Sequence, residues 1–367
     1  MKIRAAVIEE QGGAFVLEDL QLDGPRPDEL LVRLVATGIC MTDLHIRDQG
    51  YPVPLPVVAG HEGTGVVERV GEDVRTIAPG DHVVLSYPYC GHCRNCLTAD
   101  YSYCEHGFAL SFGGSRLDGT SALSRDGAPV HGHIFQQSSF ATYAIATERN
   151  TVRVPPDAPL ELLAPLACGF QTGVGAVLNA LRVRAEASIA IFGTGSVGLA
   201  AVMAAKIAGA APIIAVDVNP GRLAVAAEIG ATHTLNGRFE DVAARIAEIT
   251  RHGADYVLEG TALPEMLTLA LEVLATKGIA ALVGGAPAGT RAQIDMNTLL
   301  NGRTLRGIVQ GDAVEKLFIP KLVELYQAGR LPFDRLVRFY DFDDINQAVA
   351  DMQSGKVIKP VLRIGAL

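Results

Sequence analysis

Cysteine is the residue type whose spacing in this chain of 367 residues most clearly indicates chemistry. Four of the six cysteines, Cys90, Cys93, Cys96 and Cys104, lie in one short stretch. Four thiolates at such a spacing are the usual donors of a closed, tetrahedral structural zinc site. A redox-active cysteine pair is the alternative, but such pairs usually accompany a βαβ unit, which the surrounding sequence does not indicate. We therefore predict that residues 88–106, the zinc lobe, form a loop made rigid by Zn²⁺.

The remaining two cysteines, Cys40 and Cys168, are isolated in the sequence. Taken alone, each is more often a small buried apolar residue than a metal ligand. Because disulfides are rare in a reducing compartment, metal binding or catalysis is favoured for the thiols as a group. The spacing by itself leaves the roles of Cys40 and Cys168 open.

A second chemical signal is the glycine-rich segment 193–198, Gly-Thr-Gly-Ser-Val-Gly. It follows the apolar run Ile189–Phe192 and opens an alanine-rich stretch. In that context such a segment binds a dinucleotide pyrophosphate at a helix N-terminus. The alternative is a turn whose glycines serve packing alone. The predicted coenzyme contacts of this segment are Gly193, Gly195, Ser196, Val197 and Gly198.

An acidic residue, Asp217, ends the next apolar run. At this distance from the glycines it is expected to hydrogen-bond the adenosine ribose hydroxyls. Its carboxylate would repel a 2′-phosphate, so NAD is predicted as the cofactor. Arg222, a few residues further on, is the feature that would favour NADP instead.

Apolar strands alternate with helical patterns from residue 188 onward, which predicts an α/β fold with right-handed crossovers and a parallel sheet. The first third instead contains short β-branched runs bounded by Gly, Pro or Asp. The length suits two domains. The predicted strands are Ser188–Phe192, Ile213–Asp217, a short one near His233, Ala254–Leu258, Gly278–Val283 and Pro360–Ile364. The predicted helices are Ser196–Ala208, Pro220–Ile229, Phe239–Thr250, Pro264–Ala275 and Phe318–Ala328.

Composition narrows the function classes. With 31 basic and 40 acidic side chains the net charge is −9, which argues against a nucleic-acid-binding protein. The uncharged stretch 187–205 is long enough to span a bilayer, but its glycines and strand–helix pattern favour burial, so no membrane association is expected. The apolar run at the start of the sequence is too short for a signal peptide, so a cytoplasmic location is expected.

Together these motifs resemble the zinc-containing medium-chain alcohol dehydrogenase family. The segment Gly60-His61-Glu62-x₂-Gly65-x₅-Gly71 fits the zinc signature of that family, and the four cysteines and the glycine segment follow in the expected order. The resemblance implies a GroES-like, β-rich catalytic domain over residues 1–170, with the zinc lobe at 88–106. It also implies a Rossmann domain, a doubly wound parallel sheet that binds the coenzyme, over 171–308, and a return to the catalytic domain over 309–367.

The resemblance also assigns the isolated ligands. Cys40, His61 and Cys168 would hold a catalytic zinc with an open fourth position, giving two Zn²⁺ per chain. Asp43 would orient His61, and Glu62 would lie close behind the metal.

For the reaction, the family implies that zinc lowers the pKa of the alcohol and that hydride passes to the nicotinamide. The proton would leave through Thr42 and His45, although His45 as an ordinary surface histidine is the alternative. The expected further coenzyme contacts are Thr172 on the nicotinamide, Lys359 near the phosphates, and Val283. Met41 replaces a basic residue of several relatives that touches the pyrophosphate, so faster coenzyme release is expected.

The substrate is also inferred by resemblance. Residues 135–144 and 168–173 most resemble the aryl-alcohol (benzyl alcohol) and geraniol dehydrogenase branch, which implies interconversion of primary aromatic or allylic alcohols and their aldehydes. The expected pocket is mostly apolar and is formed by Thr42, Tyr51, Ser86, Ile134, Phe135, Gly285 and Val309.

Alternatives remain at this stage: a general primary medium-chain alcohol dehydrogenase, a glutathione-dependent formaldehyde dehydrogenase, a zinc-free quinone reductase, and a non-enzymatic binding protein on the same fold. The family implies a homodimer through strands near residues 294–309, with a tetramer left open.

Overall fold

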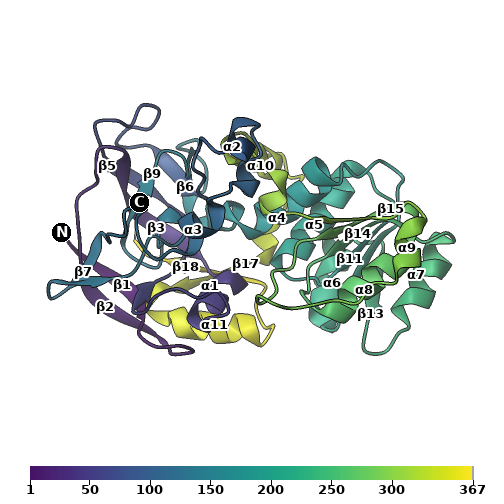
Figure 1. Ribbon diagram of the computed structural model, residues 1–367. Helices are drawn as coiled ribbons and strands as arrows, with labels where there is room; N and C mark the ends of the chain where they lie inside the picture. The colour runs from purple at the N-terminus through teal and green to yellow at the C-terminus, as the bar shows by residue number, and fades with distance from the viewer. Residues whose placement is uncertain (366–367) are drawn as a thin grey trace. The chain divides into compact units, whose positions relative to one another are not determined.

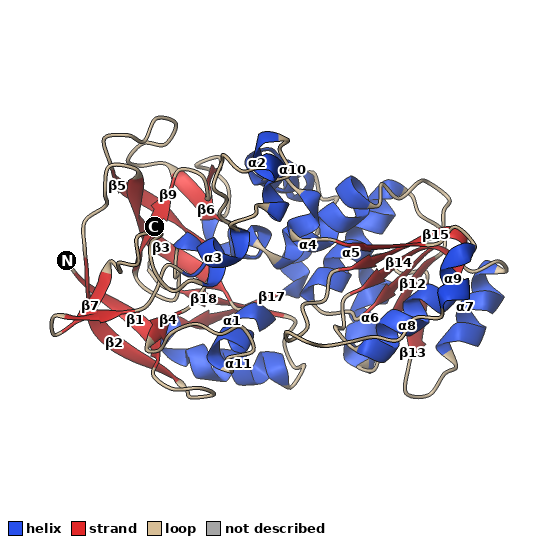
Figure 2. Cartoon of the chain, in the orientation of Figure 1, coloured by secondary structure: helices blue, strands red, loops and turns tan. Residues whose placement is uncertain are grey.

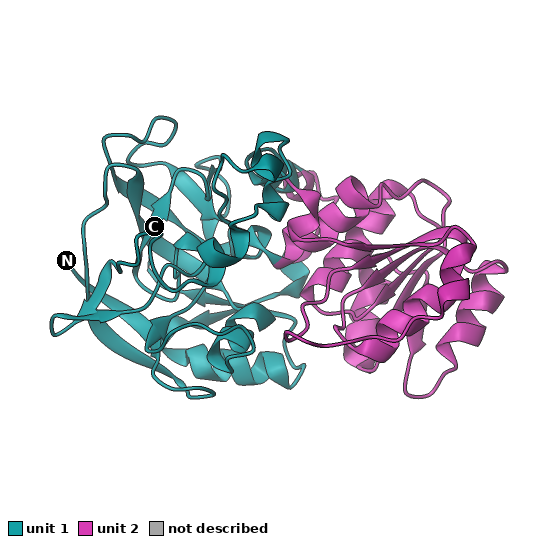
Figure 3. Ribbon diagram, viewed as in Figure 1, with its two compact units in different colours: residues 1–168, 314–324, 334–367 teal, residues 169–313, 325–333 magenta. Residues whose placement is uncertain are grey.

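The computed structural model describes residues 1–365 and divides into two compact units (Figure 1, Figure 3). The first unit comprises Met1–Cys168, Val314–Glu324 and the described chain from Asp334 onward. The second unit comprises Gly169–Ala313 and Leu325–Phe333. The chain therefore leaves the first unit, builds the second, and returns.

The boundaries differ from the sequence-based division at the C-terminal end. We assigned all of 309–367 to the catalytic domain, whereas residues 309–313 and 325–333 group with the second unit. The physical reason for the second exception is aromatic packing, because the Phe333 ring lies 5.5 Å from the Phe170 ring, centroid to centroid. That segment is thus anchored to the second unit by its side chains.

Two mostly antiparallel sheets form the framework of the first unit (Figure 2). The smaller sheet has the order β4 (Val57–Val58), β1 (Lys2–Ile8), β2 (Phe15–Leu22), β7 (Leu123–Arg125), β8 (Ala128–Val130). The larger has the order β10 (Thr151–Arg153), β6 (His82–Leu85), β5 (Gly63–Val70), β3 (Glu29–Gly38), β18 (Lys359–Arg363), β17 (Val337–Asp341), with β9 (Tyr143–Thr147) also paired to β3. Helices of this unit are α1 (Met41–Arg47), α2 (Arg94–Leu97), α3 (Gly107–Phe112) and α11 (Ile345–Gln353), and α10 (Glu315–Gln327) begins in it.

The returning strand β18 is what brings the C-terminal segment to the site. It pairs antiparallel with β3, so that Val361 lies opposite Gly38 and Leu362 opposite Thr37. β3 is buried along nearly its whole length, which explains why its sequence is almost continuously apolar. The start of β18 therefore lies beside the end of β3, where Ile39 N donates to Pro360 O at 3.0 Å just before α1.

The second unit is a six-stranded parallel sheet with helices packed on it, as Figure 2 shows. Its order is β13 (His233–Asn236), β12 (Ile213–Asp217), β11 (Ile189–Phe192), β14 (Ala254–Glu259), β15 (Leu274–Leu282), β16 (Thr304–Gly307). This is the order of a doubly wound dinucleotide-binding sheet. The helices are α4 (Gly169–Gly175), α5 (Ser196–Ala208), α6 (Pro220–Ile229), α7 (Val242–Thr250), α8 (Pro264–Glu272) and α9 (Met296–Leu300).

Several element boundaries correct the sequence-based ones. Helix α7 begins at Val242 because the Asp241 carboxylate caps it, accepting a bond from Ala244 N at 3.0 Å. Strand β15 begins at Leu274, earlier than the predicted Gly278, and α8 ends before it. In the part of the chain that the structure describes, no single helix is long and apolar enough to cross a membrane; a bent pair of short helices, Leu160–Ala167 with Gly169–Ala180, passes by length and composition alone.

Candidate active site and metal centres

The Cys-His-Cys group (Cys40, His61 and Cys168) gathers in the first unit together with Glu62. One ligand atom from each of these four residues lies within 4.8 Å of the others. Cys40 immediately precedes α1, His61 and Glu62 immediately precede β5, and Cys168 ends the 3₁₀ segment Leu160–Ala167. Residues more than 100 positions apart in the sequence thus provide one set of metal donors.

Asp43 holds the Cys-His-Cys group in place from α1. Its Oδ1 accepts from His61 Nδ1 at 2.8 Å and from Gly60 N at 3.2 Å, and its Oδ2 accepts from Cys40 N at 3.0 Å. The bond at Nδ1 directs the other ring nitrogen, Nε2, toward the group. This Nε2 is buried and has no hydrogen-bond partner among residues 1–365. An oriented, unpartnered imidazole nitrogen between two sulfurs is what a zinc ligand requires.

The electrostatics of the group are those of a cation site. Burial opposes protonation of His61, but the charge of Asp43 and its hydrogen bond hold the pKa of His61 well above its usual value. The Cys168 sulfur lowers the pKa of the Cys40 thiol well below its usual value, despite burial, and His61 acts in the same direction. A proton and a metal ion compete for these same lone pairs, so a bound cation replaces the protons.

Glu62 and Lys359 form a buried ion pair behind the ligands. Lys359 Nζ lies 2.7 Å from Glu62 Oε1 and 2.5 Å from Oε2, and it donates to Ile39 O at 3.0 Å. Burial raises the pKa of Glu62 to about 7, although the Lys359 charge opposes that shift. A Cβ on Gly38 would lie 1.9 Å from Glu62 Oε2, so only glycine fits there.

One of the predicted coenzyme residues belongs to this pair. We placed Lys359 near the coenzyme phosphates, but its side chain is 1% exposed and its ammonium is bound to Glu62. The unpaired burial of a carboxylate would be costly, so the Lys359 ammonium stabilises the buried Glu62.

The four sulfurs of the zinc lobe are spaced for a tetrahedral ion. Cys90 Sγ lies 3.9 Å from Cys96 Sγ, and Cys93 Sγ lies 3.9 Å from Cys104 Sγ. With a Zn–S distance of about 2.3 Å, the edge of a tetrahedron is about 3.8 Å, so the fit is close. Backbone N–H groups point at the sulfurs, for example Cys90 N at 3.2 Å from Cys104 Sγ and Cys93 N at 3.2 Å from Cys90 Sγ. Such donors favour thiolates.

Beside the catalytic ligands lies a row of aromatic rings, the aromatic row (Phe135, Phe112 and Tyr51). The Phe135 ring centroid is 4.6 Å from that of His61 and 5.4 Å from that of Phe112, which it meets edge-on. Phe112 in turn lies 4.9 Å from Tyr51, and Tyr51 lies 5.3 Å from His45. Sequence reasoning missed Phe112, because α3 lies in a stretch without helical periodicity and only the tertiary fold brings it to Phe135.

The backbone that carries Phe135 is strained. Residues His133, Phe135, Gln136 and Ser138 all have positive φ, a region that non-glycine residues seldom adopt. Side chains hold the segment, since Ser138 Oγ accepts from Ile134 N at 2.9 Å and Asn150 Nδ2 donates to the Phe135 carbonyl at 3.0 Å. Strain that is maintained in this way is typical of functional sites.

The remaining predicted residues of the first unit take different positions. Thr42 Oγ1 lies 3.8 Å from Cys40 Sγ, and His45 is half-buried one turn further along α1. Ser86 has no exposed surface and donates to Ala167 O at 2.8 Å, so it anchors the residue before Cys168. Met41 is 51% exposed at the start of α1.

In the second unit, the glycine segment has the geometry of a phosphate loop. Gly193 has φ +86°, and a Cβ on Gly198 would lie 1.9 Å from Gly193 O, so both positions require glycine. A Cβ on Gly195, by contrast, would meet nothing within 4 Å, so the space above this residue is open to a ligand. The segment leads into α5, whose first residue is Ser196, followed by Val197. An open backbone at a helix N-terminus suits a pyrophosphate.

Asp217 ties this loop to the end of β12. Its Oδ2 accepts from Thr194 N at 2.7 Å and Thr194 Oγ1 at 2.8 Å, while its Oδ1 accepts from Val218 N and Asn219 N. Arg222 Nε is buried and, within the described chain, has no hydrogen-bond partner. Both residues that sequence reasoning weighed for coenzyme choice thus belong to this edge of the sheet.

The other predicted residues also belong to the second unit and keep their roles as predictions. Thr172 is 8% exposed in α4, and Val283 follows β15, where its N donates to Glu259 O at 2.9 Å. Gly285 is exposed and Val309 is 49% exposed.

Comparison with known proteins gives a consistent result. Residues 26–156 match the alcohol dehydrogenase GroES-like domain, and residues 196–327 match the zinc-binding dehydrogenase domain. The chain is 45% identical over 362 residues to a geraniol dehydrogenase of Castellaniella defragrans, covering 98% of this chain and 97% of that protein. Among solved structures, an alcohol dehydrogenase zinc-binding domain protein of Burkholderia ambifaria is 54% identical to this chain, with a TM-score of 0.98. A benzyl alcohol dehydrogenase of Acinetobacter calcoaceticus is 49% identical, with a TM-score of 0.97. Each of these two matches covers 100% of both chains.

A GroES-like unit with a Cys-His-Cys group, joined in one chain to a doubly wound sheet with a phosphate loop, defines a zinc-dependent dehydrogenase. The chain belongs to the zinc-containing medium-chain alcohol dehydrogenase family, in its aryl-alcohol and geraniol branch. It is an oxidoreductase that acts on alcohols, and the predicted fold class is confirmed.

Proposed function

We propose that this protein interconverts primary aromatic or allylic alcohols and their aldehydes, with NAD as coenzyme. The observation that carries the proposal is the aromatic row, which begins 4.6 Å from the ring of the metal ligand His61. A planar, unsaturated substrate gains from edge or offset contacts with such rings, worth about 0.5–1.5 kcal/mol per pair beyond buried area. The similarity to a geraniol and a benzyl alcohol dehydrogenase supports the same substrate class.

In this proposal Cys40, His61 and Cys168 hold the catalytic zinc, which supplies a Lewis acid for the alcohol oxygen. The chain itself provides orientation and proton transfer. Thr42 and His45 are three residues apart on α1 and so lie on one face of the helix, which suits a relay from the substrate hydroxyl toward solvent. Asp43 keeps His61 in the required tautomer, and the Glu62–Lys359 pair supports the ligands from behind.

The choice of NAD and a count of two zinc ions per chain complete the proposal. Asp217, at the end of β12, favours a ribose with its 2′-hydroxyl intact. The 3.9 Å sulfur separations of the zinc lobe support a second, structural ion.

A steady-state panel of alcohols with NAD and NADP, run beside a metal count, tests the proposal. We expect kcat/KM for benzyl alcohol and geraniol to exceed that for ethanol by at least about tenfold, because the pocket rewards apolar area and aromatic contact. NAD should be preferred, and the purified protein should contain two zinc ions. A kcat/KM for ethanol equal to that for benzyl alcohol would refute the substrate assignment. A preference for NADP would refute the role of Asp217.

A further inference from the structure

Two exposed histidines on the zinc lobe form a second group of metal donors. The rings of His92 and His106 lie 5.7 Å apart, and one nitrogen of each lies within 4.8 Å of the other and of Cys90 Sγ. Both imidazoles are exposed, whereas Cys90 is only 4% exposed. Nothing in the proposed reaction uses these two side chains.

The four-cysteine site is poorly accessible to a metal ion from solvent, whereas the group of His92, His106 and Cys90 has donors at the surface. Its four sulfur-bearing residues are each at most 9% exposed, so an ion from solvent has little direct contact with them. Cys90 belongs both to the buried group of four and to the exposed group with His92 and His106. The shared sulfur connects a solvent-facing set of donors to an interior set.

The geometry of His92 is that of a prepared ligand. Its Nδ1 lies 3.1 Å from Cys90 O, a bond in which the ring N–H donates to the carbonyl. With Nδ1 protonated, the lone pair of the neutral ring is on Nε2, and a metal-binding histidine commonly has its other nitrogen bonded in this way. The backbone N of His92 also points at Cys90 Sγ, at 3.5 Å. The ring is thus fixed beside the sulfur that it shares.

We propose that His92, His106 and Cys90 form an external capture site through which Zn²⁺ reaches the four-cysteine site. The hydrated ion exchanges water for the two imidazoles and the Cys90 sulfur. It then exchanges the two imidazoles and its remaining water for the sulfurs of Cys93, Cys96 and Cys104, and each thiol that becomes a ligand gives its proton to water. The inference rests on the proposed second zinc ion, but not on the proposed substrate or coenzyme.

The test is the rate of metal loading into the full-length protein. Cys40→Ser/Cys168→Ser provides a background in which the catalytic group lacks both sulfurs, so that thiolate absorbance reports on the zinc lobe alone. After removal of metal under reducing conditions, Co²⁺ is added and thiolate-to-cobalt absorbance is followed by stopped flow. We expect the double variant His92→Gln/His106→Gln to load about tenfold more slowly than its parent and to reach the same final absorbance. His252→Gln, which removes an exposed histidine far from the lobe in the sequence, is the matched control and should load at the parent rate.

The outcomes separate the two assignments. Loading of the double variant at the parent rate would overturn the capture site while leaving the second zinc ion intact. A lower final metal content in the double variant would also overturn it, because the histidines would then be permanent ligands. No tetrathiolate absorbance in the parent would refute the second zinc ion itself, and circular dichroism establishes that each variant is folded.

Discussion

Asp43 controls the geometry of the catalytic ligands through three hydrogen bonds, to His61 Nδ1, Gly60 N and Cys40 N. In Asp43→Asn the shape is retained, but an acceptor oxygen becomes an amide donor, which opposes the Nδ1–H tautomer of His61. We expect the affinity of the catalytic zinc to fall by about 10- to 100-fold, the usual cost of losing such a partner. Competition with a chromophoric chelator measures it.

Asp48→Asn, at the exposed end of the same helix, is the control and should leave both zinc ions unaffected. In Asp43→Asn the zinc lobe should also keep its ion, because its ligands lie elsewhere in the chain. Equal chelator resistance in Asp43→Asn and the wild type would show that the carboxylate does not orient the ligand.

Phe112 lies in the middle of the aromatic row, between Phe135 and Tyr51. Replacement by leucine keeps apolar volume and removes the ring. If the row selects planar substrates, kcat/KM for benzyl alcohol should fall by about 2- to 12-fold relative to a saturated primary alcohol, which is the free energy of one aromatic pair. Phe239→Leu, at a ring that is 82% exposed, is the control. An unchanged ratio between the two alcohols would exclude the row from substrate selection.

Among single residues, the sequence proposed a set of metal ligands whose donor atoms the structure brings together, but it did not indicate all of the residues that support them. His61, Cys40 and Cys168 could be assigned because the family resemblance supplies their partners. The Glu62–Lys359 pair joins residues 297 positions apart, and the ion pair follows only from the pairing of β18 with β3. Phe112 had no local signal for the same reason: its neighbours are set by the tertiary fold.

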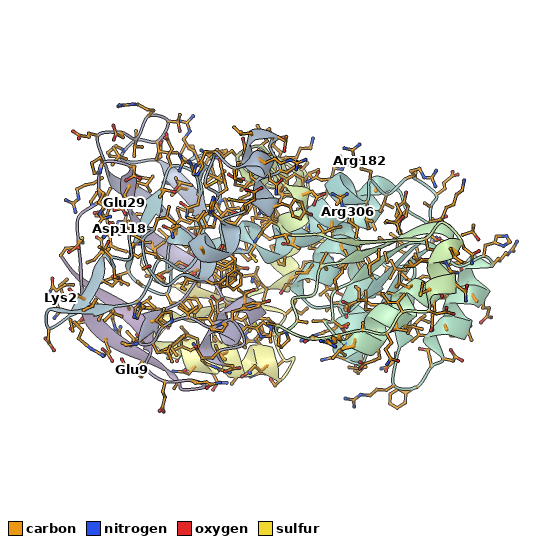
Figure 4. The ribbon with its side chains drawn as sticks, in the orientation of Figure 1. Lys2, Glu9, Glu29, Asp118, Arg182 and Arg306 are labelled. Atoms are coloured by element: carbon orange, nitrogen blue, oxygen red, sulfur yellow. The ribbon has the colours of Figure 1, made fainter. Side chains whose placement is uncertain are left out.

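Among the elements, the segment that carries Phe135 begins at His133, whose ring feels the charges of a buried ion pair. Arg116, in the loop after α3, donates to both oxygens of Glu29 on β3, at 2.6 and 2.8 Å. Figure 4 labels Glu29 and, nearby, Asp118, which receives a bond from Arg26 at 2.7 Å. His133, directly before the aromatic segment, is 5% exposed, and its Nε2 accepts from Ala122 N at 3.1 Å.

This setting makes stability depend on pH through His133. Burial, together with the Arg116 charge, lowers the pKa of His133 to about 4. The folded state therefore holds a neutral ring while the unfolded chain, with a pKa of about 6.5, takes up a proton. The contribution of the neutral His133 ring to the free energy of unfolding is fully present above the pKa that His133 has in the unfolded chain. This contribution falls as the pH drops from there toward 4, and about 2 kcal/mol of it is lost at pH 5.

Urea unfolding at pH 7.5 and pH 5 of wild type, His133→Gln and the exposed-site control His252→Gln measures this contribution. Metal release also weakens the protein in acid, so the informative quantity is the difference between variants at each pH. We expect His133→Gln to lose about 2 kcal/mol less than the wild type between the two conditions. The same loss in both proteins would mean that His133 is protonated in the folded state.

Element boundaries were predictable where a cap or a proline marks them. Helix α6 begins at Pro220, after Asn219 accepts from Gly221 N and Arg222 N, and its range matches the sequence-based one. The short helices and 3₁₀ segments between residues 86 and 140 had no such signals. Their positions depend on the cysteine spacing and on the buried contacts described above.

For the whole molecule, the alternating strand–helix pattern was enough to predict a parallel sheet with right-handed crossovers. The doubly wound strand order was implied by the family resemblance. The division of the chain was less accurate, because a return segment has no periodicity that assigns it to either unit. Only packing of rings such as Phe333 on Phe170 assigns residues 325–333 to the second unit.

The assembly state is the last property that follows from the sheet. β16 lies at the edge of the described sheet and is largely exposed. The preceding helix α9 exposes Met296 and Leu300, at 82% and 81%. Neighbouring exposed apolar side chains commonly mark a protein–protein interface. We therefore expect a homodimer that pairs β16 and α9 with their copies across a two-fold axis.

Light scattering after size exclusion tests this at micromolar protein. The wild type should have twice the mass of the chain, or four times if two such dimers associate. In the expected dimer, burial of the Leu300 side chain contributes about 2 kcal/mol per subunit to the free energy of association. Leu300→Arg replaces this side chain with a charged one, so it should shift the population toward monomer. Leu317→Arg, on α10 at 74% exposure, is the matched control and should not. A monomeric wild type would exclude this assembly, and an unchanged dimer of Leu300→Arg would mean that the chain associates through a different surface.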